Sequence, residues 1–366
     1  MNSMTHTYVA YALSSFVLAA GLTWPALASA GTSDQGPAGR EERLLRVQGR
    51  TPPQPPKPAP APRPAPQPRR PGAQQEEVDV RELTLGATGE LSLSNIAGDI
   101  AITAAKGETA RLEIVKNAMA NSEAEARRLL ELVRVDVVTR GTRVDVSVSH
   151  PHRGGPNRRG GGLTVTYTVA VPAGTRVRAQ SIAGSISSKG VKGESSYESV
   201  SGSIRVAGGG RVVSAKSISG EVELTDTDMD ITFQASSASG GITLRRVTAR
   251  RMDIGSISGM VVLEGVQASA VSAQTVSGDV QFDGPLDREG RYQLRSHSGG
   301  IRVGLPSNAG FELDATTFSG SVTTDLPINA SAAGGARGRS LRGVHGKGGA
   351  ILELTTFSGS ITIGKR

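Results

Sequence analysis

The sequence lacks cysteine and is poor in aromatic residues. None of its 366 residues is Cys, and Phe, Trp and Tyr together make up 3% of the chain. Without cysteine the chain forms no disulfide, thiolate zinc site, iron–sulfur cluster or cysteine nucleophile. With so few aromatic side chains, a large globular core anchored by them is not expected. The 47 glycines and the 37% of apolar residues instead favour a thin β architecture with short strands and tight turns.

Long hydrophobic runs are also scarce, and the one present lies near residue 1. Residues 9–22 are almost wholly apolar, which is typical of a signal-peptide core and short for a membrane span. The small residues Ala28, Ser29 and Ala30 then stand where a signal peptidase would cut. We therefore predict a signal peptide over residues 1–30 and an exported protein of the periplasm, cell envelope or extracellular space. A retained N-terminal anchor is the alternative, since no Lys or Arg precedes the apolar core.

Residues 31–75 are predicted to form a disordered, Pro-rich linker. Between Pro52 and Pro71 almost every second residue is Pro, and basic residues such as Lys57 and Arg63 lie among them. Such a run fits neither helix nor sheet and favours an extended polyproline II conformation roughly 60 Å long. It is either a stiff spacer or a basic ligand for peptidoglycan or a partner domain.

A six-residue phrase recurs through the rest of the chain. It reads SIAGSI over residues 181–186 and SVSGSI over residues 199–204, and it returns every 18 to 21 residues as far as Gly320. A period near 20 residues indicates a solenoid, in which each unit buries its apolar face against its neighbours. We predict an all-β, single-stranded β-solenoid of about 19-residue coils over residues 179–366. The structural glycines of the repeat are Gly98, Gly184, Gly202, Gly220, Gly240, Gly259, Gly278, Gly299, Gly320 and Gly359.

Alignment on this glycine predicts how one coil is built. Every copy has Ile or Val two residues after the glycine, which suits a stacked strand. Every copy has Ser, Thr or Asn three residues before it, and we expect these side chains to bond backbone groups in a ladder spaced by about 4.8 Å. We expect one strand at positions −7 and −5, a bend, and a second strand at −2, 0 and +2. The glycine is explained either by a positive φ or by a cross-section of the coil that is too narrow there for a Cβ atom.

Residues 76–178 are predicted to be a β-rich N-terminal capping region with one helix. An early copy of the phrase, around Gly98, lies inside it. Ser122 and Glu125 form a capping box, and an apolar stripe follows, which together predict a helix over residues 122–133. Because the end unit of a solenoid needs a cover, we expect this region to shield the first coil.

A basic insertion over residues 327–349 separates the last two copies of the phrase. It contains no acidic residue and four basic ones in its second half, which are Arg337, Arg339, Arg342 and Lys347. It is either a flexible solvated loop or a contact for an anionic envelope polymer or lipid head group. After the copy at Gly359 no cap is visible, so we expect an exposed sheet edge through which the chain self-associates.

Two charged motifs are interpreted as structural. Asp226, Asp228 and Asp230 begin like a calcium loop, but Ile231 follows in place of Gly, so a solvated turn is expected. A basic cluster lies nearby at Arg245, Arg246, Arg250 and Arg251. The net charge of +8 favours anionic partners, whereas predicted export and scarce aromatics argue against nucleic acid.

The repeated Gly-[Asp/Ser/Glu]-[Ile/Val] phrase resembles the bacterial putative-adhesin family, a domain of unknown function. The resemblance covers residues 80–366 and includes the helix at 122–133, the turn Val171-Pro172-Ala173-Gly174 and the Gly-rich insertion before the final repeat. It implies a β-solenoid in a cell-envelope setting, and it supplies no catalytic residue that maps onto this chain.

Two classes of function follow. The first is a non-enzymatic envelope protein that displays a rigid solenoid as an adhesin, a scaffold or a stress-associated binding module. The second is a polysaccharide-active β-helix lyase or hydrolase, which needs carboxylates clustered on one face. The aligned columns assemble no such cluster, so we favour the first class and expect no catalytic residue, metal or cofactor.

Overall fold

The computed structural model describes residues 73–149, 162–330 and 337–366, which all belong to the compact unit Gln67–Arg366. The predicted signal peptide and the Pro-rich run lie outside the described residues. The first strand of the described residues begins at Ala73, three residues before the expected start of the capping region at 76. Within the described part the fold is all-β, with 27 strands in one open sheet and one helix.

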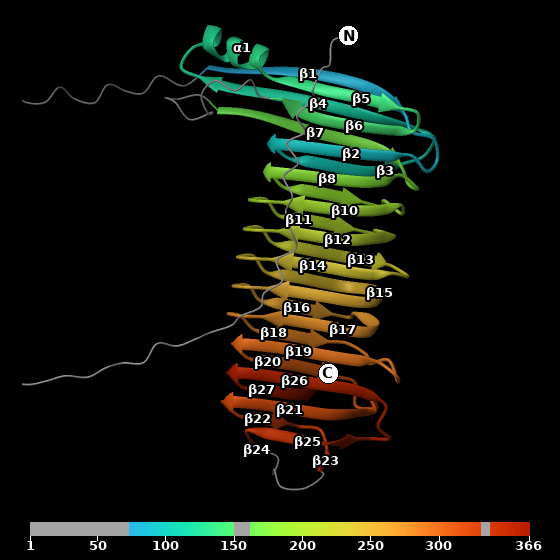
Figure 1. Ribbon diagram of the computed structural model, residues 1–366, viewed down its shortest axis with the longest axis vertical. Coiled ribbons are helices and arrows are strands. Elements are labelled where there is room, and N and C mark those ends of the chain that lie inside the picture. Colours follow the sequence, from blue (N-terminus) through green and yellow to red (C-terminus); the bar gives the residue numbers. More distant parts are fainter. Residues whose placement is uncertain (1–72, 150–161, 331–336) are drawn as a thin grey trace, which may run out of the picture. The chain divides into compact units, whose positions relative to one another are not determined.

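Each coil contributes one strand to each of two rows of parallel strands, which are stacked in Figure 1. The first row, before the repeat glycine, contains β2 (Glu90–Ala97), β8 (Arg176–Ala183), β10 (Glu194–Ser199), β12 (Arg211–Ser217), β14 (Thr232–Ser237), β15 (Ile242–Ser256), β17 (Gln267–Thr275), β19 (Arg291–Ser298), β26 (Ala350–Ser358) and β21 (Phe311–Ser319). The second row contains β3 (Ile100–Ala105), β9 (Ile186–Lys189), β11 (Ile204–Ala207), β13 (Val222–Asp228), β15 again, β16 (Val261–Glu264), β18 (Val280–Asp283), β20 (Ile301–Leu305), β27 (Ile361–Lys365) and β22 (Val322–Thr324).

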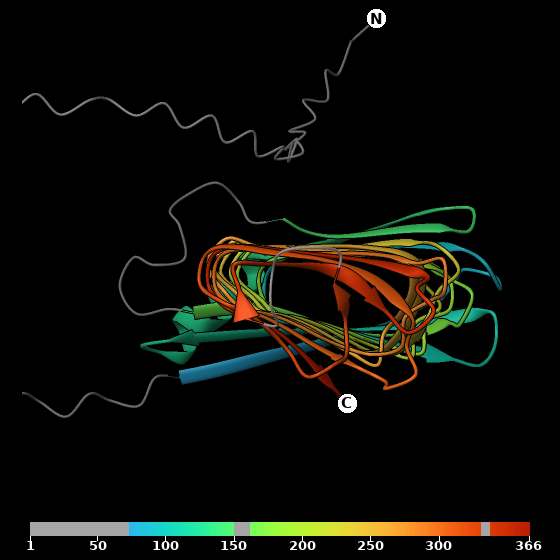
Figure 2. The ribbon, with the colours of Figure 1, turned by 90° about the horizontal axis from the view of Figure 1, so that it is seen from below.

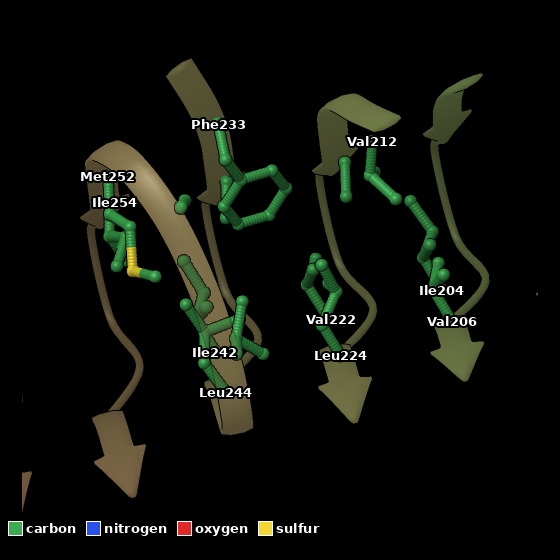
Figure 3. Close-up of a cluster of buried hydrophobic side chains, with 14 of the residues drawn as sticks. Ile204, Val206, Val212, Val222, Leu224, Phe233, Ile242, Leu244, Met252 and Ile254 are labelled. Atoms are coloured by element: carbon green, nitrogen blue, oxygen red, sulfur yellow. The ribbon is translucent and has the colours of Figure 1, made fainter. Parts of the chain in front are cut away.

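The core is a narrow apolar filling between the two rows. The β-branched residue after each glycine is buried in every coil, as are most residues at positions −7 and −5. Figure 3 shows this filling in successive coils, with Ile204, Val222 and Ile242 from the second row and Val212, Phe233 and Met252 from the first. Viewed along the stack in Figure 2, the coils superpose on one flattened outline. The predicted packing of β-branched residues is therefore confirmed.

A ladder of hydroxyl bridges joins the coils at the repeat glycines. Ser217 Oγ accepts a hydrogen bond from Gly220 N at 2.8 Å and donates one to Gly202 O, in the previous coil, at 3.0 Å. The equivalent hydroxyl donates to the glycine carbonyl of the neighbouring coil at Ser199, Ser237, Ser256, Thr275, Ser296, Thr356 and Thr317. The prediction of a polar ladder at position −3 is confirmed.

Ser181 is the exception in this ladder. Its hydroxyl is buried without a hydrogen-bond partner. The carbonyl of Gly98, in the neighbouring coil, instead accepts from the amide of Asn95 at 2.7 Å. The same amide also donates to Val165 O at 2.7 Å, so the larger Asn side chain ties the first coil to the capping region.

The repeat glycines are required by close approach of successive coils. Among them only Gly98 has a positive φ, so the left-handed conformation does not explain the others. A Cβ atom on Gly240 would collide with the carbonyl group of Gly220 in the coil before it, and every later repeat glycine faces its neighbour in the same way. The lack of space lies between coils, along the stack, and not across the narrow section that the sequence suggested.

The bend lies later in the repeat than the sequence predicted. Position −3 stays in phase with −7 and −5 on the buried face, because its hydroxyl turns inward to reach the glycine carbonyl. The chain therefore bends over positions −2 to +1, and the second strand begins at +2, as at Ile186. The assignment of position −2 to the second strand was wrong, and that column points to solvent.

The N-terminal capping region extends each row by one parallel strand and then by antiparallel strands. The first row continues through β6 (Arg143–Ser149) to β5 (Arg134–Arg140), and the second continues through β7 (Gly162–Pro172) and β4 (Thr109–Ala120) to β1 (Ala73–Thr84). The helix α1 (Glu123–Leu132) packs on β1 and β4, and Ser122 Oγ accepts from Glu125 N at 3.3 Å as its N-cap. The predicted helix and its cap are confirmed.

The C-terminal coils are stacked out of sequence order. β26 pairs with β19 on one side and with β21 on the other, and β27 likewise lies between β20 and β22. The coil at residues 311–324 is therefore the outer one, and the last coil of the sequence is enclosed. The expectation of an exposed edge at that last coil was wrong, because both of its strands are hydrogen-bonded on both sides.

The basic insertion covers the outer coil. β25 (Ser340–His345) pairs antiparallel with β21, β24 (Arg337–Gly338) pairs with β22, and β23 (Asn329–Ala330) pairs with β25. Leu341 is buried against the core. The described part of the insertion is therefore a C-terminal cap and not a solvated loop.

We predict that Gly240→Ala destabilises the fold strongly, whereas Gly255→Ala does not. At position 240 the added methyl group collides with a backbone carbonyl. At position 255 it makes only an ordinary contact, 3.9 Å from the side chain of Gln274. The expected loss of unfolding free energy is about 2–4 kcal/mol at position 240 and below about 0.5 kcal/mol at position 255. Urea unfolding followed by circular dichroism measures both, and equal losses would contradict the stacking of glycines.

We predict slow hydrogen exchange in β27 despite its place near residue 366. Its amides are enclosed between two strands, and Ile361 N donates to Ser321 O at 2.9 Å. Exchange mass spectrometry of the full chain should show β27 protected like β20 and better than β23 and β24 at the cap. Faster exchange in β27 than in β24 would show that the sequence order, and not the enclosed order, describes the stack.

Candidate binding surface

The bend of each coil places one column of residues on the outside of the stack. This column, position −2 of the repeat, is named here the bend ridge. In stack order it contains Ile96, Ile182, Val200, Ile218, Ala238, Ile257, Val276, His297, Phe357 and Phe318. Ten coils about 4.8 Å apart make the ridge about 43 Å long.

The bend ridge exposes large apolar side chains in most coils. Ile182 is 52% exposed, Ile218 and Ile257 are each 44% exposed, and Phe318 is 65% exposed. These side chains add nothing to the buried filling, since positions −3 and +2 on either side of the bend face inward. Six of the ten positions carry an exposed large apolar side chain, Ile96, Val200 and Ala238 are partly exposed, and a row of exposed apolar residues of this kind is a recognised sign of an interaction surface.

Three stacked rings form the C-terminal part of the ridge. The rings of His297 and Phe357 lie 4.9 Å apart with an interplanar angle of 9°, and those of Phe357 and Phe318 lie 4.7 Å apart with an angle of 5°. This stacking follows from the enclosed position of the last coil, which places Phe357 between its two neighbours. This trio was not predicted, because 39 positions separate Phe318 from Phe357 along the chain.

The bend is almost free of charge. Over positions −2 to +1 of all ten coils there is no Lys or Arg, and the three acids are Asp99, Glu221 and Asp279. Asp99 accepts from Ser185 N and Asp279 accepts from Gly300 N, each at 2.8 Å, so these two carboxylates hold neighbouring coils together.

A shallow row of small residues runs alongside the bend ridge, because position −1 is Ser or Ala in every coil.

The predicted anionic contact residues lie on the C-terminal cap, and only part of the set is available to a ligand. Arg342 forms an ion pair with Asp314 at 2.8 Å. Arg339 and Lys347 are exposed, and Arg339 O accepts from Thr317 N at 2.8 Å, which places this backbone beside the end of the bend ridge. Arg337 belongs to β24, and its side chain lies outside the described set.

Two arginines of the basic cluster pair with two aspartates of the acidic triplet in the neighbouring coil. Arg246 binds Asp226 through two hydrogen bonds of 2.6 and 2.9 Å, and Arg250 binds Asp230 at 3.2 Å. These bonds hold the pKa of Asp226 below its usual value. Asp226 and Arg246 also have positive φ values of 50° and 51°, in a column where other coils place glycine. All three carboxylates are exposed, as expected for a solvated site, but Asp226 and Asp228 belong to the strand β13 (Val222–Asp228), so the expectation of a turn was wrong for these two residues.

A second charge ladder runs along the outer face of the second row. Glu223 pairs with Arg205 at 3.7 Å and with Arg245 at 3.3 Å, and Arg245 also binds Glu264 at 2.9 Å. Among the described residues, no group of three or more His, Cys, Asp or Glu is placed to hold a metal ion. In the same part of the chain, no helix is long and apolar enough to cross a membrane.

Comparison with known proteins identifies the family. The model of the family described as Toastrack DUF4097 matches residues 77–364. The chain belongs to this family. A search of curated proteins finds no match. The sequence-based assignment to an adhesin-like family of unknown function is therefore confirmed, and the Toastrack assignment agrees with the open stack of strands described above.

Three solved structures are among those similar to this Toastrack chain. A putative adhesin from Bacteroides fragilis is 13% identical with a TM-score of 0.39, and the match covers 79% of this chain and 97% of that one. A putative lipid binding protein from Parabacteroides distasonis is 12% identical with a TM-score of 0.43, covering 79% and 96%. A putative cell adhesion protein from Clostridium sporogenes is 11% identical with a TM-score of 0.21, covering 80% and 100%. Similarities of this size carry no argument about a ligand.

We predict that the bend ridge is dispensable for folding. Ile218→Thr and Ile257→Thr keep a β-branched residue at an exposed site, so each should change the unfolding free energy by less than about 0.5 kcal/mol. Leu224→Ala, at a fully buried site, is the matched comparison and should cost about 2–5 kcal/mol. Urea unfolding tests this difference, and comparable losses at the three positions would place the ridge in the core.

Proposed function

We propose that this Toastrack protein is an exported, non-enzymatic binding module of the cell envelope that acts as an adhesin or scaffold. The observation that carries the proposal is the bend ridge, a column along the whole stack in which six of ten coils expose a large apolar side chain outside the buried core. A solenoid suits this role because its stacked coils present one column of side chains in a straight, regular array. The apolar segment at residues 9–22 supports export.

The proposal includes a second contact at the C-terminal cap. Arg339 and Lys347 are exposed there, on a segment without acidic residues, and their charge favours anionic envelope polymers or lipid head groups. The nearby pair of Arg342 and Asp314 contributes less, because the two charges largely cancel. Such contacts are screened by salt, so they would support a first encounter more than tight binding.

A binding assay with point variants tests this function. The full chain is incubated with isolated peptidoglycan, lipopolysaccharide and teichoic-acid fractions, and the bound protein is measured by co-sedimentation at low and high salt. Deletion of the insertion is unsuitable, since β24 and β25 cover the outer coil. Arg339→Gln combined with Lys347→Gln removes the charge and leaves the backbone pairing in place.

We expect retention by at least one fraction, with the cap variant losing the salt-sensitive part of it by about threefold or more. The control for loss of positive charge alone is Arg211→Gln combined with Lys216→Gln, at two exposed side chains of β12 in the first row. No retention by any fraction would contradict the envelope-binding function. Equal losses in the cap variant and its control would show that general charge, and not the cap, is responsible.

A further inference from the structure

We propose that the bend ridge docks onto the bend ridge of a second copy of this chain. This inference rests on the proposed binding role of the ridge and names its partner. It places self-association on the flank of the solenoid, whereas the sequence suggested the last coil, which is enclosed. Three features of the ridge favour a second copy as the partner: its profile, its charge and its area.

The profile of the bend is self-complementary. Large apolar residues occupy position −2 in eight of the ten coils, the exceptions being Ala238 and His297. Beside them lies the shallow row formed by Ser or Ala at −1 and Gly at 0, as at Ser258 and Gly259. A second copy related by a two-fold axis can place its apolar column in this shallow row and receive the first column in its own. Because both copies repeat every coil, at about 4.8 Å, the two surfaces remain in register along the whole ridge. A partner with a different period would be out of register after a few coils.

The charge on the bend favours an uncharged partner surface. No Lys or Arg lies between positions −2 and +1 in any coil, although the chain as a whole carries a net charge of +8. An anionic membrane would be attracted elsewhere on the protein, and Glu221 would oppose its approach to the ridge. An apolar column with few charges resembles the centre of a protein–protein interface.

The area suits a weak and reversible dimer. A bend about 13 Å wide and about 43 Å long covers on the order of 600 Å² on each copy. The total of about 1,200 Å² lies at the lower limit of specific protein interfaces. We therefore expect association in the micromolar range, strengthened where many copies are held on one surface.

Analytical ultracentrifugation of the full chain tests the proposal. From low micromolar to several hundred micromolar protein, we expect a reversible shift from monomer to dimer. Ile218→Glu combined with Ile257→Glu should weaken this association at least about tenfold, because the two charges would be buried in the middle of the ridge. Val138→Glu combined with Val80→Glu is the matched control, since both residues are exposed valines on other strands, at 43% and 47%.

Disulfide trapping provides a second measurement that does not depend on a destabilised variant. The chain has no cysteine, so Ser239→Cys supplies the only thiol, at an exposed position near the middle of the stack. We expect a cross-linked dimer on mild oxidation, which is lost when Ile218→Glu and Ile257→Glu are added. Thr243→Cys, outside the bend on β15, should cross-link less efficiently.

Three outcomes would overturn the second-copy proposal. A monomer at every concentration would do so, and so would equal weakening by the control pair, which would place the interface elsewhere. Binding of the monomer to neutral phosphatidylcholine vesicles, lost in the ridge variant, would identify a lipid surface as the partner. Retention by envelope fractions tests the proposed function separately, because a protein that stays monomeric can still bind them through its cap.

Discussion

The stack depends on one interaction, the hydroxyl bridge between neighbouring coils at the repeat glycine. In four coils the hydroxyl at position −3 accepts from its own glycine N–H and donates to the glycine carbonyl of the coil before it, as Ser217 does between Gly220 and Gly202. In four further coils the hydroxyl donates to the glycine carbonyl of a neighbouring coil. This bridge satisfies backbone groups that the bend removes from the strand ladders, which would otherwise be costly to bury. It also brings the coils so close that no Cβ fits on the glycine. The close contact between coils therefore requires both the hydroxyl at position −3 and the glycine. This explains why the six-residue phrase recurs with so little variation.

The same bridge determines which side chains reach solvent. Because position −3 turns inward, position −2 must turn outward, and the apolar residues there become an exposed column. The geometry that closes each coil thus creates the surface through which we propose that the protein acts. Folding constrains the glycine, the hydroxyl and the β-branched residue after them, whereas the identity of the residue at −2 is left to function.

Much of the fold could be predicted from sequence, because a repeated coil shows its periodicity many times. The β-branched column, the hydroxyl ladder and the helix after Ser122 were predicted and are found. The bend was misplaced because Ile182 and its equivalents are apolar and were taken for core residues. The enclosed last coil could not be predicted, since Thr356 fits the carbonyl of Gly299 as well as Thr317 would. The ring stack of Phe318 and Phe357 was missed for the same reason, because it depends on that exchange of order.

The enclosed coil has a consequence for how the protein is made. Chains emerge from the ribosome in sequence order, and a solenoid can ordinarily add each coil to the last as it appears. Here residues 311–324 are synthesised first, yet their final neighbour is the coil at residues 350–366. The stack can therefore grow in sequence order only as far as the coil of Gly299. Residues 311–324 must either remain undocked until residues 350–366 are made, or dock on that coil first and then be displaced by residues 350–366. Completion of this end is therefore a late step of biosynthesis, and the chain reaches its final form only after residues 350–366 have been synthesised.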